Sequence, residues 1–152
     1  MSTKVLPSTG QKESFFTELT AQRGPSEAAI ARQLLDYFKP PMTRIWYGSG
    51  KKLGSIIPVF DHLGVGYSLF AVWTTGSVEI YFQWYNKPPF NDEQKRLELL
   101  HKLNQIKDVS ISVDKISARP NIPLNRLTEK NEFKKFTDIY AWFIYEIKKY
   151  GL

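Results

Sequence analysis

Cysteine is absent from this 152-residue chain, and histidine occurs only twice. The lack of cysteine excludes a disulfide framework, a thiolate zinc site and a cysteine nucleophile. No apolar run approaches the ~20 residues of a membrane-spanning helix. The first residues, MSTKVLPSTGQKESFF, lack the apolar core of a signal peptide. We therefore expect a cytoplasmic protein without a membrane partner or a cofactor.

The chain carries an excess of positive charge. It has 21 lysine and arginine residues against 15 aspartate and glutamate residues, which gives a net charge of +6 and an isoelectric point near 9.4. A basic balance of this kind is typical of nucleic-acid-binding domains, and it points to nucleic acid or another polyanion as a partner. Solubility alone also accounts for a few units of net charge on a small domain. The charge therefore leaves both explanations open.

Length and apolar periodicity predict one α+β domain over residues 13–152, preceded by a flexible polar tail over residues 1–12. Apolar residues at helical spacing predict helices, and β-branched and aromatic runs predict strands. The expected helices cover 13–23, 27–39, 92–105 and 129–150, and the expected strands cover 43–47, 55–60, 66–74, 77–84 and 109–113. The order α-α-β-β-β-β-α-β-α lacks βαβ alternation. We therefore expect a single four- or five-stranded, mostly antiparallel sheet flanked by helices.

The stretch from Gly66 to Trp84, GYSLFAVWTTGSVEIYFQW, is the centre of the expected sheet. Its two apolar runs flank a short glycine-containing connection, which is typical of a β-hairpin. Both faces of the first run are mostly apolar, and this predicts cover on both sides of that strand. Pro58 has no backbone N–H group, so it predicts an edge position for the strand over 55–60.

Cations and aromatic residues share several of the expected strands and loops. Four cations are candidates for contacts with nucleic acid: Arg44, Lys51, Lys52 and Lys87. The lysine pair lies in GSGKKLGS, whose backbone N–H groups can face an anion, although a plain hairpin turn is the favoured interpretation. If one sheet face is open, aromatic residues between these cations would suit stacking on exposed bases. The aromatic candidates are Trp46, Tyr81 and Trp84.

The number of amphipathic helices favours the opposite interpretation of these aromatic residues. Three or four helices around one sheet would cover both of its faces and place the aromatic residues in the core. His62 and His101 form no recognisable catalytic arrangement, so we expect structural or surface roles for both. We expect the lysines of the last helix to form a solvated face: Lys130, Lys134, Lys135, Lys148 and Lys149.

Asp61 and Glu79 are the candidate metal ligands. An aspartate at a strand end, followed by a glutamate on the next hairpin, is similar to the acidic pair with which PD-(D/E)xK nucleases hold magnesium, a metal that needs hard oxygen ligands. Those nucleases have a lysine two residues after the glutamate, whereas this chain has Tyr81 there. The favoured interpretation is that Asp61 is a turn residue and that Glu79 pairs with Arg44 or a lysine. Beyond this alternative, we assign no catalytic residue and no metal ligand.

Most of the chain resembles a group of uncharacterised bacterial proteins. The similarity is carried by RIWYGSG, GSIIPVF, YSLFAVWTTGSVEIYFQW, PPF, RLELLHKLNQI, VSISVDKI and RPNIPL, and the preceding FFTELTAQRGPSEAAIARQLLDYF also fits. It implies a bacterial cytoplasmic protein and transfers no functional residue, because we know no activity for the group. The helix–strands–helix order is also similar to small α+β domains attached to restriction and DNA-repair proteins, but topology does not fix function.

Three functions are compatible with these observations. The leading hypothesis is a non-catalytic binding or accessory module associated with nucleic acid, because the charge is positive and no catalytic set stands out. The second is a diverged metal-dependent nuclease that uses Asp61 and Glu79. The third is a protein–protein adaptor or homodimer that uses exposed aromatic residues such as Trp46 or Trp84.

Overall fold

The computed structural model describes residues 9–40, 42–48 and 54–150. Two helices, α1 (Thr9–Arg23) and α2 (Pro25–Tyr37), precede the strands β1 (Arg44–Gly48), β2 (Ser55–His62), β3 (Val65–Ser68), β4 (Phe70–Trp73) and β5 (Ser77–Ile80). The rest contains α3 (Glu93–Leu103), β6 (Asn121–Pro123), α4 (Lys130–Tyr150) and the 3-10 helices η1 (Phe82–Trp84), η2 (Val113–Lys115) and η3 (Leu124–Leu127). The expected α+β class is confirmed.

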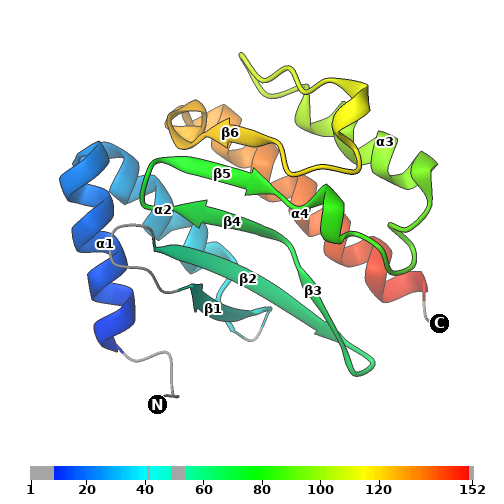
Figure 1. Ribbon diagram of the computed structural model, residues 1–152, viewed down its shortest axis with the longest axis horizontal. Coiled ribbons are helices and arrows are strands. Elements are labelled where there is room, and N and C mark those ends of the chain that lie inside the picture. The colour runs from blue at the N-terminus through cyan, green and yellow to red at the C-terminus, as the bar shows by residue number, and fades with distance from the viewer. Residues whose placement is uncertain (1–8, 41, 49–53, 151–152) are drawn as a thin grey trace.

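The strands form one antiparallel sheet with helices on one of its faces. In the described part of the chain the sheet has six strands in the order β1-β2-β4-β5-β6, and β3 also pairs with β2. The predicted count of four or five is therefore too low. Helices α2 and α4 lie behind the sheet in Figure 1, and no described α-helix lies over the face toward the viewer. The expectation that helices cover both faces is wrong for these residues.

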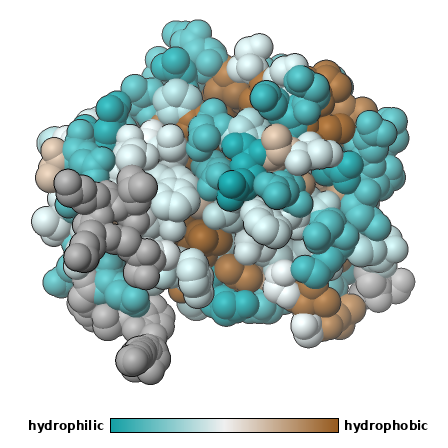
Figure 2. All heavy atoms as spheres, viewed as in Figure 1, coloured by the Kyte–Doolittle hydropathy of each residue, from teal (hydrophilic) through white to brown (hydrophobic). Residues whose placement is uncertain are grey.

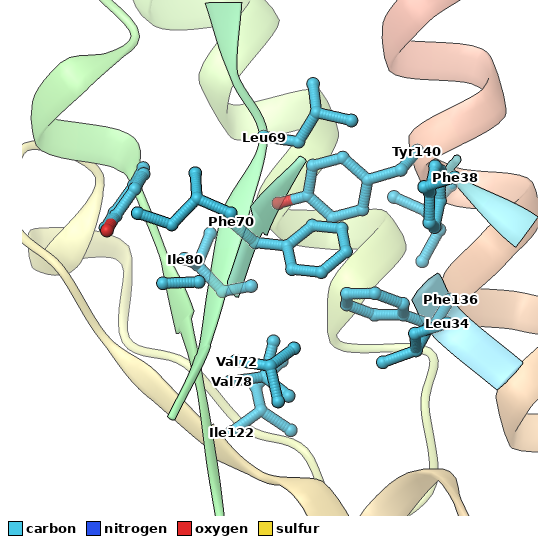
Figure 3. Close-up of a cluster of buried hydrophobic side chains, with 14 of the residues drawn as sticks. Leu34, Phe38, Leu69, Phe70, Val72, Val78, Ile80, Ile122, Phe136 and Tyr140 are labelled. Atoms are coloured by element: carbon cyan, nitrogen blue, oxygen red, sulfur yellow. The ribbon is translucent and has the colours of Figure 1, made fainter. Parts of the chain in front are cut away.

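The core lies between the sheet and helices α2 and α4 (Figure 3). The strand register aligns Ile56, Val72, Val78 and Ile122 across four neighbouring strands, so their side chains share the covered face. Phe70 lies at the centre of this layer. Its ring centroid is 5.5 Å from that of Phe38, the residue that caps the C-terminus of α2, and 5.0 Å from those of Phe136 and Tyr140 on α4. These aromatic contacts hold both helices against the same strand.

The first run of the expected hairpin is interrupted at Leu69. Val59 of β2 pairs with Ser68, and Ile56 of β2 pairs with Val72. These two pairs are three residues apart on β2 but four residues apart on the run that forms β3 and β4. One extra residue on one strand is a β-bulge. It shifts the side-chain alternation, so Leu69 is fully buried with the core residues while Ser68 points to the open face. The run is apolar in both phases for this reason, and not because both faces are covered.

Pro58 lies in an internal strand, so the expected edge position is wrong. Strand β2 pairs with β1 on one side and with β3 and β4 on the other. The carbonyl of Pro58 accepts a hydrogen bond of 3.0 Å from the N–H group of Leu69. In an antiparallel strand, the N–H and C=O groups of one residue point to the same neighbour. The missing N–H group of Pro58 therefore faces the bulge, where the ladder is already interrupted.

The expected strand over 109–113 does not form, and β6 completes the sheet instead. The side chain of Asn104 donates to the carbonyl of Ile111 (3.0 Å) and accepts from its N–H group (2.7 Å), so both backbone groups of Ile111 are engaged outside a sheet. The segment that follows Pro120 forms β6, which pairs with β5 through Val78 and Ile122. The strand expected over 77–84 ends at Ile80, where η1 follows.

Several helix boundaries also differ from the sequence-based expectation. Helix α1 begins at Thr9, four residues before the expected start, and therefore includes part of the segment expected as a tail. Helix α2 begins at Pro25, two residues before the expected start, and Gly24 is its N-cap. Helix α3 is capped by Asp92, whose side chain accepts from the N–H group of Gln94.

The turn between β4 and β5 lies against the junction of α1 and α2. Gly76 has φ of +85°, and a Cβ atom there would lie 2.7 Å from Nε of Arg23 and from Oε1 of Glu27. Arg23 and Glu27 form an ion pair of 3.1 Å at this point. The positive φ favours glycine here, and a larger side chain would also have to displace the Arg23–Glu27 pair.

Candidate functional site: an aromatic groove on the open face of the sheet

A groove of about 710 Å³ crosses the open face of the sheet. Its floor includes Ile57 and Val59 of β2, and its walls include Trp46, Trp73 and Trp84. In Figure 2, which shows this face, apolar atoms are visible near the centre between more hydrophilic residues. The groove thus combines an apolar floor with aromatic walls.

The register of the strands explains why these residues meet. Trp46 of β1 pairs with Ile57 of β2, and Arg44 pairs with Val59. Paired residues in neighbouring strands lie side by side on the same face. Ser55 of β2 pairs in turn with Trp73 of β4. The alternation of the strands therefore brings aromatic, apolar and cationic side chains from separate segments together on the open face.

The two outer tryptophans of the groove are half-exposed. Trp46 retains 53% of its accessible surface and Trp84 retains 51%. Trp84 lies on this face because η1 interrupts the strand alternation, with a hydrogen bond of 2.8 Å from the N–H group of Trp84 to the carbonyl of Tyr81. The prediction that these two residues belong to the core is wrong, whereas Tyr81 is buried at 8% exposure. Burial, and secondarily the charge of Glu79, raises the pKa of Tyr81 to about 12.

Arg44 lies on the groove and is paired with Asp61. Its Nε donates to Oδ2 of Asp61 at 2.6 Å, and its Nη2 lies 3.3 Å from Oδ1. Gly66 lies beneath this pair on β3. A Cβ atom at residue 66 would lie 3.2 Å from Nη2 of Arg44 and 3.3 Å from Oδ1 of Asp61. Glycine therefore leaves room for the ion pair to lie across the strand.

Arg119, which is not among the cations predicted from the sequence, lines the groove beside β5. Its Nε is 3.5 Å from Oε2 of Glu79. The carbonyl of Pro120 accepts from the N–H group of Ile80 at 2.8 Å, which fixes this segment along β5. Glu79 also accepts a hydrogen bond of 3.0 Å from Nε1 of Trp73. The extended run at Pro120 was the available signal, but its pairing with β5 was not evident from the pattern.

Two of the four predicted cations lie among the described residues, and one of these two, Arg44, lies in the groove. Lys51 and Lys52 lie outside the described residues. Lys87 is exposed in the loop after η1 and is not part of the groove lining, and its carbonyl accepts from the N–H groups of Phe90 and Asn91.

Asp61 and Glu79 are not brought together as a metal site. Glu79 pairs with Ala71 next to Val72, which pairs with Ile56 of β2. Asp61 lies four to five residues further along β2, or roughly 13–16 Å at the rise of a strand. Asp61 is a strand residue rather than a turn residue. Glu79 was expected to pair with Arg44 or a lysine, but it pairs with Arg119, and Arg44 pairs with Asp61. Among the described residues, no group of three or more His, Cys, Asp or Glu is placed to hold a metal ion.

The histidines and the α4 lysines lie elsewhere. His62 stacks on Phe60 with ring centroids 5.9 Å apart, and His101 is exposed on α3. Three lysines of α4 have carboxylate partners: Lys134 pairs with Asp138 at 2.7 Å, Lys135 with Glu132 at 3.1 Å and Lys149 with Glu146 at 3.1 Å. All five α4 lysines are exposed, as expected of a solvated face, although Glu132 and Glu146 are themselves buried.

No protein-family model matches this chain, and no curated protein or solved structure matches it. The similarity to a group of bacterial proteins, and the bacterial origin and cytoplasmic location that it implies, therefore stay predictions from the sequence pattern. None of the described helices is both long and apolar enough to cross a bilayer.

Proposed function

We propose that the protein is a non-catalytic binding module whose open sheet face binds single-stranded nucleic acid in the aromatic groove. The observation that carries the proposal is the presence of two half-exposed tryptophans and two arginines in one groove. Trp46 and Trp84 supply flat apolar surfaces, and Arg44 and Arg119 supply positive charge beside them. The nucleic acid supplies the matching chemistry, because it alternates flat bases with anionic phosphates.

The exposed indoles are suited to stacking. Large apolar side chains are normally buried, and half-exposed tryptophans that share a groove indicate a binding surface. Stacking of a base on an aromatic side chain contributes about 1–3 kcal/mol and tolerates any base, because every base has a π-face. Binding by this groove is therefore expected to show little sequence preference.

The shape and charge of the groove favour unpaired strands. In a duplex the base faces are stacked on one another, so indoles that line a groove cannot reach them. The net charge of +6 favours any polyanion, and phosphate contacts add a salt-dependent contribution to affinity. Arg44 uses Nε and Nη2 for Asp61, and a guanidinium group carries five N–H donors in all. A phosphate can therefore approach Arg44 through Nη1.

Fluorescence anisotropy with a labelled single-stranded DNA of about 16 nucleotides tests this proposal, since that length is the upper end of the range for one binding domain. We expect salt-dependent binding that is weaker for the corresponding duplex. Trp46→Ala and Trp84→Ala should each weaken binding by about 1–3 kcal/mol, or roughly 5- to 150-fold in Kd. Both side chains are half-exposed, so the variants should fold, which circular dichroism checks.

Tyr145→Ala is the matched control, because Tyr145 is an exposed aromatic residue on α4 with 59% of its surface accessible. It should leave the affinity unchanged. Absence of salt-dependent binding, or equal binding by the tryptophan variants and the control, would overturn the proposal. A concentration-dependent dimer in light scattering that is lost in Trp46→Ala would assign the groove to a second copy of the chain instead.

A further inference from the structure

We infer that Asp61 and Glu79 are specificity-determining residues of the groove that act as built-in competitors for its arginines. This inference rests on the proposed function. Each carboxylate is paired with an arginine that an incoming phosphate would bind. A phosphate can therefore bind the arginine only by displacing the carboxylate. The acidic pair is then explained without a metal ion or a catalytic role.

The same arrangement occurs twice on the open face of the sheet, once at β2 and once at β5. On β2, Asp61 holds Arg44 through contacts of 2.6 and 3.3 Å, and both side chains are about half-exposed. On β5, Glu79 lies 3.5 Å from Arg119, which is also about half-exposed. Exposed guanidinium groups can leave such pairs at little cost, because solvent screens the interaction.

Glu79 is the more firmly fixed of the two carboxylates. Its side chain retains only 11% of its accessible surface, and it accepts a hydrogen bond of 3.0 Å from the indole of Trp73. When Arg119 turns to a phosphate, Glu79 cannot follow it and loses its charged partner in a partly buried site. Glu79 therefore opposes the exchange more strongly than Asp61, which can turn into solvent.

The chemistry of this exchange determines which ligands bind. A small free anion must displace a carboxylate that is already held beside the arginine at a high effective concentration. A strand that stacks on Trp46 or Trp84 brings its phosphates to the arginines as an intramolecular step and overcomes this competition. The groove therefore selects ligands that carry rings and phosphates on one chain, and inorganic phosphate alone should bind poorly.

The test uses Asp61→Asn and Glu79→Gln, which keep the shape and an acceptor oxygen but remove the charge. At 0.15 M salt, each should bind the single-stranded DNA about two- to fivefold more tightly than the wild type, the range that a partly exposed ion pair is worth. Asp138→Asn and Glu98→Gln are the matched controls, because each carboxylate pairs with a lysine outside the groove. The two control substitutions should change Kd by less. The Debye length is about 8 Å at this salt concentration, so charges further than this from the bound strand are largely screened.

Double variants separate competition from simple charge repulsion. If Asp61 acts through Arg44, Asp61→Asn should give no gain in an Arg44→Gln background, and Glu79→Gln should give none in an Arg119→Gln background. A gain that persists without the arginine, unchanged affinity or weaker binding overturns the inference. If the wild type binds through Trp46 and these results fail, only the inference is wrong, whereas absence of any binding removes the proposed function as well.

Discussion

At the scale of single residues, the buried tyrosine pair behind the β-bulge links the helix layer to the sheet. The hydroxyl group of Tyr85 donates to the carbonyl of Leu69 and lies 3.0 Å from the hydroxyl group of Tyr140 on α4. Both side chains are buried, and burial raises the pKa of each hydroxyl group. The groove owes its shape to this bulge, because the bulge sets which side chains of the run face outward.

Tyr85→Phe should therefore destabilise the protein more than Tyr140→Phe. The first substitution leaves the Leu69 carbonyl and the Tyr140 hydroxyl without this partner in the core, and a buried unsatisfied group costs about 1–3 kcal/mol. The second leaves the bond between Tyr85 and Leu69 in place, so about 0.5–1.5 kcal/mol is expected. Urea unfolding followed by circular dichroism measures both. Equal losses, or the reverse order, would contradict this role for Tyr85.

At the scale of elements, α3 and α4 are joined through one buried carboxylate. Glu146 of α4 is 5% exposed and lies 2.6 Å from Nζ of Lys95 on α3 and 3.1 Å from Nζ of Lys149. Burial alone would raise the pKa of Glu146, but the hydrogen bonds from Lys95 and Lys149 outweigh it, and the pKa lies below its usual value. The charged form of Glu146 is therefore favoured by the folded state.

This lowered pKa predicts loss of stability in acid. The contribution of Glu146 is present above its unfolded pKa of about 4.3 and is lost as the pH falls through the lower folded pKa. Melting temperatures measured between pH 7 and pH 3 should therefore fall more steeply for the wild type than for Glu146→Gln. At pH 7 this variant should be less stable by about 1.5–3 kcal/mol, the scale of a hydrogen bond to a charged group.

Glu98→Gln is the control for this comparison, because Glu98 is the half-exposed second partner of Lys95 at 3.3 Å. It should cost less than Glu146→Gln at pH 7, since exposed pairs contribute little. If the two variants are equally stable, or if Glu146→Gln keeps the full acid dependence of the wild type, Glu146 does not join the helices in this way.

The sequence predicted the type of most elements, but not the details that form the groove. Helical spacing located the four α-helices of the described residues because each buries one apolar face: α2 and α4 face the sheet, α1 packs on α2, and α3 packs on α4. The alternation of β5 was also correct as far as Ile80. The bulge at Leu69 was hidden because apolar residues occupy both phases of the run. Pro58 was wrongly assigned to an edge strand because the bulge was not foreseen. An internal strand tolerates this proline only because its missing N–H group faces the bulge.

The candidate site was only half predictable for a related physical reason. Arg44 and Trp46 share one phase of a short strand, so the pattern placed them together correctly. Trp84 and Arg119 reach the same groove through a 3-10 turn and through a strand pair between residues about 40 positions apart. Pairing at such a distance in sequence follows from packing of the whole chain rather than from local propensity.

At the scale of the whole molecule, cations lie on both sides of the sheet but in different surroundings. On the open face, Arg44 and Arg119 stand beside half-exposed tryptophans. On the helical side, α4 carries lysines that pair with carboxylates of their own helix, such as Lys134 with Asp138. Net charge alone does not distinguish the two faces. The proposed function requires that the open face carry the phosphate contacts.

The salt dependence of binding distinguishes these faces. For single strands, each phosphate contact contributes about 0.7 to the slope of log affinity against log salt concentration. Arg119→Gln should therefore reduce the magnitude of the slope by about 0.7, and Arg44→Gln should do the same. Lys134→Gln and Lys149→Gln should leave the slope unchanged, because these lysines lie on α4 rather than in the groove. Anisotropy titrations at several salt concentrations measure each slope. If the lysine variants reduce the slope and the arginine variants do not, the nucleic acid follows the helical face, and the aromatic groove belongs to another ligand.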